Sequence, residues 1–367
     1  MTDDSQLFIV YSLIFLLEDL HSSGNKNAIF HIIAKYRRSI PKITNFQRVI
    51  ERWDDDVFIA TFRLSREGIE ALLAIIAPSL SKRKLGRPAV PVELKTLLSL
   101  KYLSSQESFR ELSIVFNISV GACSQILREF CLAIVKNIGN FIIFPRTAAE
   151  FYRLENEFDF PGAIGAIDGC HIRVSPPKAE REHYYNRKMY HSINFQAICN
   201  NRREFLDVFC KYPGSVHDAR VFNNSDIYRF VSEGRIEIPE RFHLLGDSAY
   251  PRTTWLVPPF KDNGTLSNRQ KNFNFLHSSK RIVIEHTFGV LKARFRRLST
   301  TFRNIKMLPL IITTTCALHN LCIKYNRGDA SLNEDFILTP DHEDHYDDMN
   351  AVGQADKRLV LMDLLGL

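Results

Sequence analysis

The chain has 367 residues, of which 45% are hydrophobic and 24% are charged, and its formal net charge is +7. This length allows about two domains, and the composition is that of a globular protein, which argues against general disorder. The charge is uneven, because eight acidic residues and no basic ones lie between Asp329 and Asp348, leaving +15 on the rest of the chain. So basic a body favours a polyanionic partner, although a solvated basic surface would give the same count.

Seven cysteines are scattered along the chain, and no two of them form a CxxC pair. This pattern indicates reduced thiols of an intracellular protein and argues against a disulfide framework or a zinc site. The apolar run Leu7–Leu17 is too short to span a bilayer, and it lacks the basic start and cleavage site of a signal peptide. We therefore expect a soluble, intracellular protein with no membrane partner.

Residues 1–85 are predicted to be an N-terminal helical region, because apolar residues such as Phe8, Tyr11 and Phe15 recur with helical spacing. The basic segment 81–88 closes this region. It could serve as a nuclear localisation signal, as an arm that contacts phosphates, or simply as a solvated linker.

Residues 86–150 are predicted to contain a helix-turn-helix. The expected helices are Pro91–Leu103, Ser108–Phe116 and one from Ser119 to about Val135. Ser108 and Glu111 fit a capping box, and two short helices joined by a three-residue turn fit the motif, although most helical hairpins bind no DNA. The exposed face of the last helix would carry Val120, Gly121, Ser124, Gln125 and Arg128, and we take Gln125 and Arg128 as candidate DNA contacts.

Residues 151–328 are predicted to form a mixed α/β domain, and residues 329–367 an acidic C-terminal tail whose end, Leu359–Leu365, could dock on the body. Runs rich in Ile, Val and Phe, separated by polar turns, predict strands. The predicted strands are Ala163–Asp168, His191–Cys199, Glu204–Tyr212, Phe242–Gly246 and an edge strand Trp255–Phe260. The predicted helices are Asn223–Ser232, Ser279–Leu298 and Leu308–Tyr325.

Two aspartates are predicted to end neighbouring strands. Asp168 and Asp247 each close an apolar run, next to a glycine. Burying a carboxylate at such a place is costly unless a cation lies beside it. If the two strands are neighbours, the two carboxylates converge. A glycine beside the acid would let backbone or a phosphate come close.

A third acid, Glu285, lies on the predicted helix Ser279–Leu298 and would share one face with basic residues and a glycine. These are Arg281, Gly289, Lys292 and Arg296. An acidic ligand beside basic residues suits a metal site against which a phosphodiester lies, and Arg281, Lys292 and Arg296 are therefore further candidate DNA contacts. The alternative is an ordinary salt bridge between Glu285 and Arg281 at i, i−4.

Carboxylate ligands, with no cysteine pair and few histidines, point to Mg²⁺ or Mn²⁺ as the cofactor. In a two-metal scheme such ions activate the attacking hydroxyl and stabilise the leaving oxygen of a phosphodiester. The candidate metal ligands and catalytic residues are Asp168, Asp218, Asp247 and Glu285. Neither a nucleotide-binding P-loop nor a nucleophile elbow occurs in the sequence.

Six segments in this order resemble the PIF/Harbinger superfamily of DDE transposases and the nucleases derived from them. They are Gly165–Gly169, Tyr184–Lys188, Pro213–Phe222, Leu245–Pro251, Ile284–Phe295 and Leu318–Asn320. The resemblance implies an RNase H-like catalytic core, a divalent metal cofactor, cleavage and joining of DNA, a nuclear location and a Myb/SANT-like partner protein. Cys170 stands where the family often has Thr.

The resemblance also implies that Asp168 and Glu285 are the first and last acids of a catalytic triad. The middle acid stays open, because Asp218 lies in the motif often aligned with it, whereas an RNase H-like core usually places it where Asp247 lies. We predict that Asp247 is nearer the metals and that Asp218 is a ligand or lies behind one.

The expected fold is therefore an RNase H-like mixed-sheet core preceded by an all-α region with a helix-turn-helix. The expected function is a metal-dependent DNA nuclease or transposase, acting in the nucleus, with the cytoplasm as a second compartment, and able to form a homodimer. The alternative is a domesticated DNA-binding or scaffolding protein whose acids persist without turnover.

Overall fold

The computed structural model describes residues 43, 46, 50–81, 90–326 and 356–367. Thr44–Leu367 forms one compact unit, distinct from Met1–Ile43. The predicted helical stripe at Phe8–Phe15, the basic segment 82–88 and the acidic run 329–348 lie outside the described residues. The following description concerns the compact unit only.

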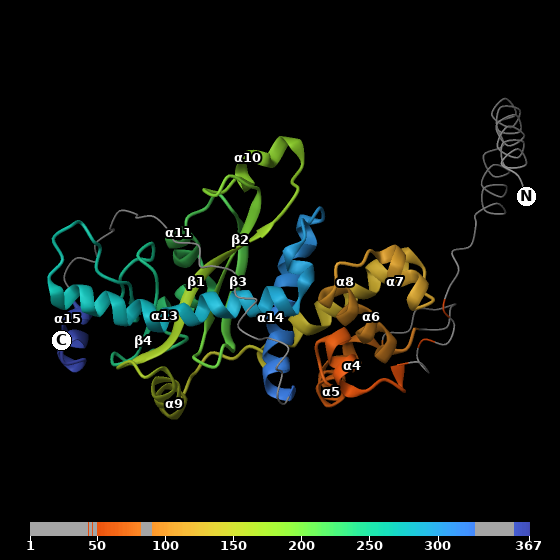
Figure 1. Ribbon diagram of the computed structural model, residues 1–367, viewed down its shortest axis with the longest axis horizontal. Coiled ribbons are helices and arrows are strands. Elements are labelled where there is room, and N and C mark those ends of the chain that lie inside the picture. Colours follow the sequence, from red (N-terminus) through yellow and green to blue (C-terminus); the bar gives the residue numbers. More distant parts are fainter. Residues whose placement is uncertain (1–42, 44–45, 47–49, 82–89, 327–355) are drawn as a thin grey trace, which may run out of the picture. The chain divides into compact units, whose positions relative to one another are not determined.

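A five-stranded sheet in the order β3-β2-β1-β4-β5 forms the centre of this unit (Figure 1). The strands are β1 Ala163–Arg173, β2 Ser192–Cys199, β3 Phe205–Pro213, β4 His243–Leu245 and β5 Leu256–Val257. β1, β2 and β3 are antiparallel neighbours, while β4 is parallel to β1 and β5 is parallel to β4. The sheet is therefore mixed, and the predicted α/β class with an antiparallel meander is confirmed.

The prediction that a strand ends at Asp168 is wrong. β1 continues to Arg173, because Gly169–Arg173 remain paired with Gln196–Ser192 of β2. Asp168 thus lies inside a long strand, where β1 is paired with β2. The predicted helix Asn223–Ser232 is present as α12 Asp226–Ser232, but it starts later than predicted because Ser225 is its N-cap, and a separate helix, α11 Asp218–Asn223, precedes it.

Helices cover both faces of the sheet, and successive residues of a strand point to opposite faces. On one face, Ala166 and Cys170 of β1 join the core formed with α13 Asn268–Arg294 and α14 Leu308–Tyr325. On the other face, Ile164 and Ile167 join the core formed with α9 Ala148–Phe158, α11 and α12. We call these the α13 face and the α11 face.

Helix α13 is longer and begins earlier than its sequence predicts. Ser267 and Gln270 form a capping box that starts the helix ahead of the predicted Ser279. The helix ends at Arg294, and Phe295 is fully buried at the point where the chain leaves the axis. Arg296 therefore lies in the 3-10 helix η3 Arg296–Ser299, so its predicted place on the helical stripe of Glu285 is wrong.

An all-α layer precedes the sheet and shares the hydrophobic core of the α13 face. Its helices are α4 Asp55–Phe62, α5 Arg66–Leu80, α6 Val92–Ser104, α7 Phe109–Val115 and α8 Val120–Lys136. The predicted capping box of Ser108 with Glu111 and the predicted N-cap Ser119 are confirmed. The bend between α7 and α8 is 99°. Gln125 and Arg128 are exposed on α8, as predicted.

The end of the chain docks on the sheet domain through α15 Lys357–Leu364, as the apolar pattern predicts. Leu361 and Met362 are buried in the core. The ammonium of Lys357 donates hydrogen bonds to the carbonyls of Glu240 at 2.6 Å and of Phe242 at 3.1 Å. Short helical segments complete the fold: η1 Ile138–Asn140, η2 Lys178–Glu180, α10 Arg181–Tyr184 and η4 Ile305–Met307.

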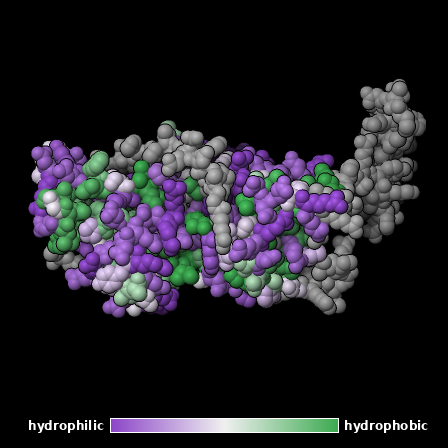
Figure 2. All heavy atoms as spheres, turned by 60° about the horizontal axis from the view of Figure 1, so that its bottom comes forward, coloured by the Kyte–Doolittle hydropathy of each residue, from purple (hydrophilic) through white to green (hydrophobic). Residues whose placement is uncertain are grey.

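All seven cysteines are buried and free, as their spacing predicts. The segment Ile305–Tyr325 is long and apolar enough to cross a membrane, and so is the bent pair α7 and α8 taken together. The first of these is 61% buried inside the protein, with Ile311 and Leu318 in the core. Hydrophilic and hydrophobic residues alternate over the face in Figure 2. We therefore interpret α14 as a core helix.

Candidate active site

Two of the predicted acids lie at the same level on neighbouring parallel strands, Asp168 inside β1 and Asp247 just after β4. Ala166 of β1 is paired with Leu245 of β4, and Asp168 and Asp247 each come two residues later. Asp168 shares the face of Ala166, which is the α13 face. Asp247 lies just beyond β4 in a turn, where its Oδ1 accepts a hydrogen bond of 3.0 Å from the amide of Ala249. The predicted proximity of the two strands is thus confirmed.

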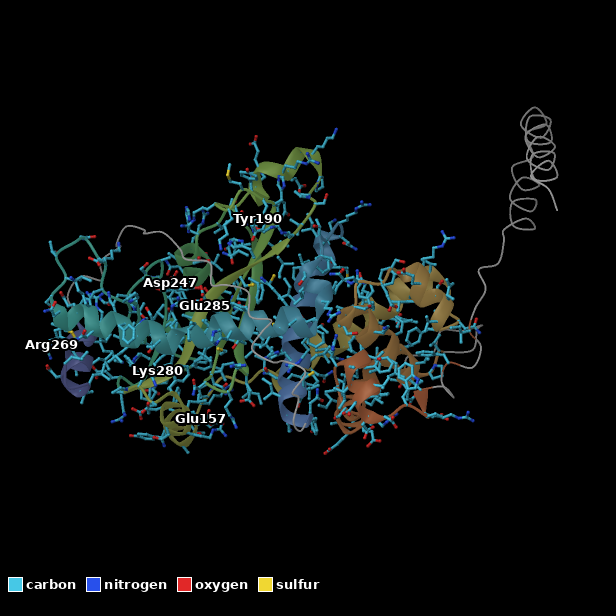
Figure 3. All side chains as sticks on the ribbon, viewed as in Figure 1. Glu157, Tyr190, Asp247, Arg269, Lys280 and Glu285 are labelled. Atoms are coloured by element: carbon cyan, nitrogen blue, oxygen red, sulfur yellow. The ribbon has the colours of Figure 1, made fainter. Side chains whose placement is uncertain are left out.

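Arg281 of α13 joins two of the acids directly. Its Nη1 lies 3.0 Å from Oδ2 of Asp168, and its Nη2 lies 2.5 Å from Oε1 of Glu285. These side chains are mostly buried, with exposed fractions of 18% for Arg281, 13% for Asp168 and 23% for Glu285. Figure 3 labels Glu285 on α13 and Asp247 just above that helix in the same view. A carboxylate from the sheet and one from the helix therefore meet through a single guanidinium.

The electrostatics of Arg281 bring in the third acid. Burial lowers the pKa of Arg281, but the negative charges of Asp168, Glu285 and Asp247 outweigh burial and raise this pKa above its usual value. An arginine is already charged at any physiological pH, so its protonation does not change. What the shift reveals is that three carboxylates act on one cation.

Asp218 belongs to the other face of the sheet. It begins α11, is only 5% exposed, and its Oδ1 accepts a hydrogen bond of 2.7 Å from the amide of Asn194. A Cβ added at Gly169 would lie 2.5 Å from that same oxygen. Since residue 169 points away from the side of Asp168, Asp218 lies on the α11 face. The glycine after Asp168 makes room for Asp218, not for a ligand as its position suggested.

Gly289 and Lys292 lie one and two turns after Glu285 on α13. A Cβ added at Gly289 would meet no atom within 4 Å, so no packing requires this glycine. Lys292 reaches β1, because its charge and hydrogen bond oppose the rise that burial causes in the pKa of the Cys170 thiol. The stripe of Glu285 thus carries an open position followed by a cation next to β1.

Asn194 is a residue of the candidate site region that the sequence did not reveal. Its amide holds Asp218, while its own Oδ1 is buried without a hydrogen-bond partner. The contact joins residues 24 apart on two elements, and an isolated asparagine in an apolar strand gives no signal of it. Only the register of β1 and β2, which sets Asn194 opposite His171, places it near Asp218.

The arrangement fits a divalent cation by its donor chemistry and not by its present geometry. Asp168, Asp247 and Glu285 offer the carboxylate oxygens that Mg²⁺ and Mn²⁺ prefer. Within the described part of the chain, however, no group of three His, Cys, Asp or Glu side chains is placed to hold a metal ion. The salt bridge between Glu285 and Arg281, the alternative from the sequence, is present and extends to Asp168.

Comparison with known proteins finds a matching family model and several similar proteins. Residues 167–320 match the DDE superfamily endonucleases. "Putative nuclease HARBI1" of Rattus norvegicus is 29% identical over 279 residues, covering 74% of this chain and 78% of that protein. The Homo sapiens protein of that name is 27% identical over 312 residues, covering 83% and 88%.

A plant protein is similar as well. "Protein ALP1-like" of Arabidopsis thaliana is 27% identical over 316 residues, covering 80% of this chain and 76% of that protein. No solved structure matches the chain significantly. The resemblance drawn from the six sequence motifs is thereby confirmed. Residues 167–320 thus match the DDE superfamily endonucleases, and the chain is similar to these relatives over most of its length.

Proposed function

We propose that this protein is a divalent-metal-dependent DNA endonuclease with an RNase H-like core. The observation that carries the proposal is the position of Arg281, whose charge is stabilised by Asp168, Asp247 and Glu285 together. Carboxylates from a central strand and a covering helix thus contact one cation, and the charge of a third, which follows the parallel neighbouring strand, acts on it. The mixed five-stranded sheet supports an RNase H-like core, and the family match supports the nuclease chemistry.

In this proposal Asp168, Asp247 and Glu285 hold Mg²⁺ or Mn²⁺. Such an ion, when bound, polarises the phosphodiester and lowers the pKa of an attacking water. Arg281 must then give up its contacts with Asp168 and Glu285, because a carboxylate oxygen cannot bond a guanidinium and a metal ion in the same direction. Arg281 therefore acts as the resting counter-charge of the acids, which spares them mutual repulsion before DNA and metal arrive.

The substrate backbone would lie along α13 beside the acids. Gly289 leaves open space one turn from Glu285, so a phosphate can approach the helix closely. Lys292, one turn further, supplies a positive charge for that phosphate. Asp218 would stay outside the metal site, since it faces α11 and is held by Asn194.

Helices α7 and α8 would add a second DNA contact as a helix-turn-helix. The 99° bend between them falls near the range of that motif, and Gln125 and Arg128 are exposed on α8. We expect Arg128→Ala to weaken binding to duplex DNA and to reduce its salt dependence by about one phosphate contact. An unchanged salt dependence would leave α8 with a structural role only.

The Myb/SANT-like partner, the homodimer and the nuclear location, with the cytoplasm as a second compartment, rest on the family resemblance alone. Fluorescence microscopy of the tagged chain, with and without residues 81–88, would test the location. Sedimentation of the purified chain would test the homodimer.

A DNA-binding or scaffolding protein without turnover is the second candidate function. It is favoured by one observation, namely that Arg281 already neutralises Asp168 and Glu285. In that case the ion pairs would stabilise the fold, and Asp168 and Glu285 would stay bonded to Arg281 and bind no metal ion.

Nicking of supercoiled plasmid separates the two functions. The wild-type chain should nick DNA with Mg²⁺ or Mn²⁺ and not with a chelator present. Asp168→Asn and Glu285→Gln should lower the rate by more than about a hundredfold and still bind DNA. Asp226→Asn is the matched control, because Asp226 forms ion pairs on the surface of α12 with Lys211 and Arg229. Absence of nicking under all metal conditions would favour the second function.

A further inference from the structure

The connection between β1 and β2 protrudes beyond the end of the sheet and contains η2 and α10 (Figure 1). Its exposed charged residues are mostly basic. From residue 173 to residue 191 there are two exposed acids, Glu180 and Glu182. The exposed lysines and arginines of the same segment are five: Arg173, Lys178, Arg181, Arg187 and Lys188. An excess of positive charge on a projecting segment favours contact with a polyanion.

The turn Asn186–Met189 is closed by several hydrogen bonds. Asn186 is 3% exposed, and its amide N–H donates to the carbonyl of Tyr190 at 2.9 Å. Its side-chain Oδ1 accepts from the amide of Tyr190 at 3.2 Å, and its Nδ2 donates to Oγ of Ser192 at 2.9 Å. The guanidinium of Arg173 stacks 4.0 Å from the Tyr190 ring centroid. These contacts hold the turn in one conformation.

Met189, at the end of this turn, is unusual in both its backbone conformation and its exposure. Its φ of 63° lies in the left-handed region, which a non-glycine residue rarely adopts. Its side chain is 77% exposed, the largest exposure of any large hydrophobic residue in the described ranges. A glycine would avoid the strain, and a polar residue would avoid the exposed apolar surface. Strain of this kind tends to persist where function requires it.

The turn lies beyond the end of β1, which continues five residues past Asp168 to Arg173 before the connection begins. The charge of Lys188 acts on the thiol of Cys170, two residues after Asp168. Burial lowers the pKa of His217, and the charge of Arg187 lowers it further, which places Arg187 near the start of α11. Figure 3 labels Tyr190 at the base of the protrusion, above Asp247 and Glu285. The charges of Lys188 and Arg187 therefore act back toward the sheet from a turn that lies past its end.

We propose that the turn Asn186–Met189 is a DNA wedge, in which Met189 enters a base step of the bound duplex while Arg187 and Lys188 bind the flanking phosphates. This inference rests on the proposed function. Apolar side chains such as methionine unstack bases when flanking cations hold the backbone. The wedge would open the duplex beyond the end of β1, on the part of the DNA that extends away from the acids.

The test uses Asp168→Asn as a non-cleaving background and two short duplexes of one sequence. One duplex is fully paired, and the other has a single mismatch flanked by the fluorescent base 2-aminopurine. Because a mismatch lowers the cost of unstacking, the Asp168→Asn protein should bind the mismatched duplex about tenfold more tightly. The 2-aminopurine fluorescence should rise on binding.

Substitutions of Met189 then show whether this side chain causes the mismatch preference and the rise in fluorescence. Met189→Ala should abolish both the preference for the mismatch and the rise in fluorescence, whereas Met189→Leu should keep them. Leu364→Ala is the control, because Leu364 is an exposed hydrophobic side chain on α15. Thermal melting of each variant checks that folding is intact, and Met189→Gly should melt no lower than wild type because glycine relieves the left-handed strain.

Two outcomes would overturn the inference in different ways. If Met189→Ala kept the preference and the fluorescence change, the wedge would be wrong while the nuclease proposal stood. If neither duplex bound to the protein with intact Met189, the proposed function would fail and the wedge with it.

Discussion

Asp168 and Gly169 are neighbours on β1, yet they point to opposite faces of the sheet, and the two faces treat acids differently. On the α13 face, Asp168, Asp247 and Glu285 act on the charge of Arg281. On the α11 face, Asp218 is held by the neutral amide of Asn194. Acids that share a cation can exchange that cation for a metal, whereas a buried acid bonded to a neutral amide is held in place. The face of the sheet, and not the distance along the chain, separates the candidate ligands.

The largest expected effect on the nicking rate comes from substituting, one at a time, the two candidates for the middle acid. Asp247→Asn should lower plasmid nicking by more than about a hundredfold, because it removes one ligand of the α13 face. Asp218→Asn should lower it by less than about tenfold, because Asn can still accept the hydrogen bond from Asn194. Initial nicking rates at saturating Mn²⁺ measure both. A larger loss in Asp218→Asn would reverse the assignment of the two faces.

Gly169→Ala should destabilise the protein by crowding the α11 face, and it should leave the acids of the α13 face in place. The new Cβ would lie 2.5 Å from Oδ1 of the buried Asp218, and overpacking of this kind costs about 1–3 kcal/mol. Urea denaturation measures the loss. Adding Asp218→Ala should restore part of the stability, because it removes the atoms that the methyl group meets. Equal losses in the single and the double variant would show that Asp218 is not the obstacle.

Arg281→Gln should sharpen the account of the α13 face. Removing the guanidinium leaves Asp168 and Glu285 without their shared counter-charge, so a divalent cation no longer competes with arginine. The Mn²⁺ concentration that gives half-maximal nicking should fall by about three- to tenfold. A rise in that concentration would mean that Arg281 helps to hold the metal site or the DNA.

Gly289→Ala should have the smallest effect on the fold. Alanine is favoured over glycine inside a helix by up to about 1 kcal/mol, and the added Cβ meets no atom within 4 Å. The variant should therefore unfold at a higher urea concentration than wild type. Its DNA affinity should fall by about two- to fivefold if a phosphate passes over this position. Unchanged affinity would show that the DNA backbone does not pass over α13 at this position.

The sequence predicted those parts of the site that depend on strand order. Apolar runs placed Asp168 and Asp247 at strands, and two parallel neighbours bring them to one level. The i, i−4 spacing also allowed the ion pair of Arg281 with Glu285. It could not reveal that Arg281 reaches Asp168, because that contact joins residues 113 positions apart and depends on how α13 packs across the sheet.

The errors have local physical causes. The stripe was extended to Arg296 because no glycine or proline marks the end of α13, whereas the helix stops where Phe295 enters the core. β1 was cut short because Asp168 and Gly169 look like a strand end. In the structure, pairing with β2 carries the strand past them, and Asp218 fills the space that the glycine leaves. Both facts depend on contacts between distant segments.

Calorimetric titration of Mn²⁺ into the metal-free protein tests the central claim most directly. We predict that the wild-type chain binds Mn²⁺, that Asp168→Asn loses this binding, and that Asp218→Asn keeps it within about threefold. The same titration at raised ionic strength checks that binding is not a general effect of surface acids. Absence of Mn²⁺ binding by the wild type, or equal losses in the two variants, would contradict the account.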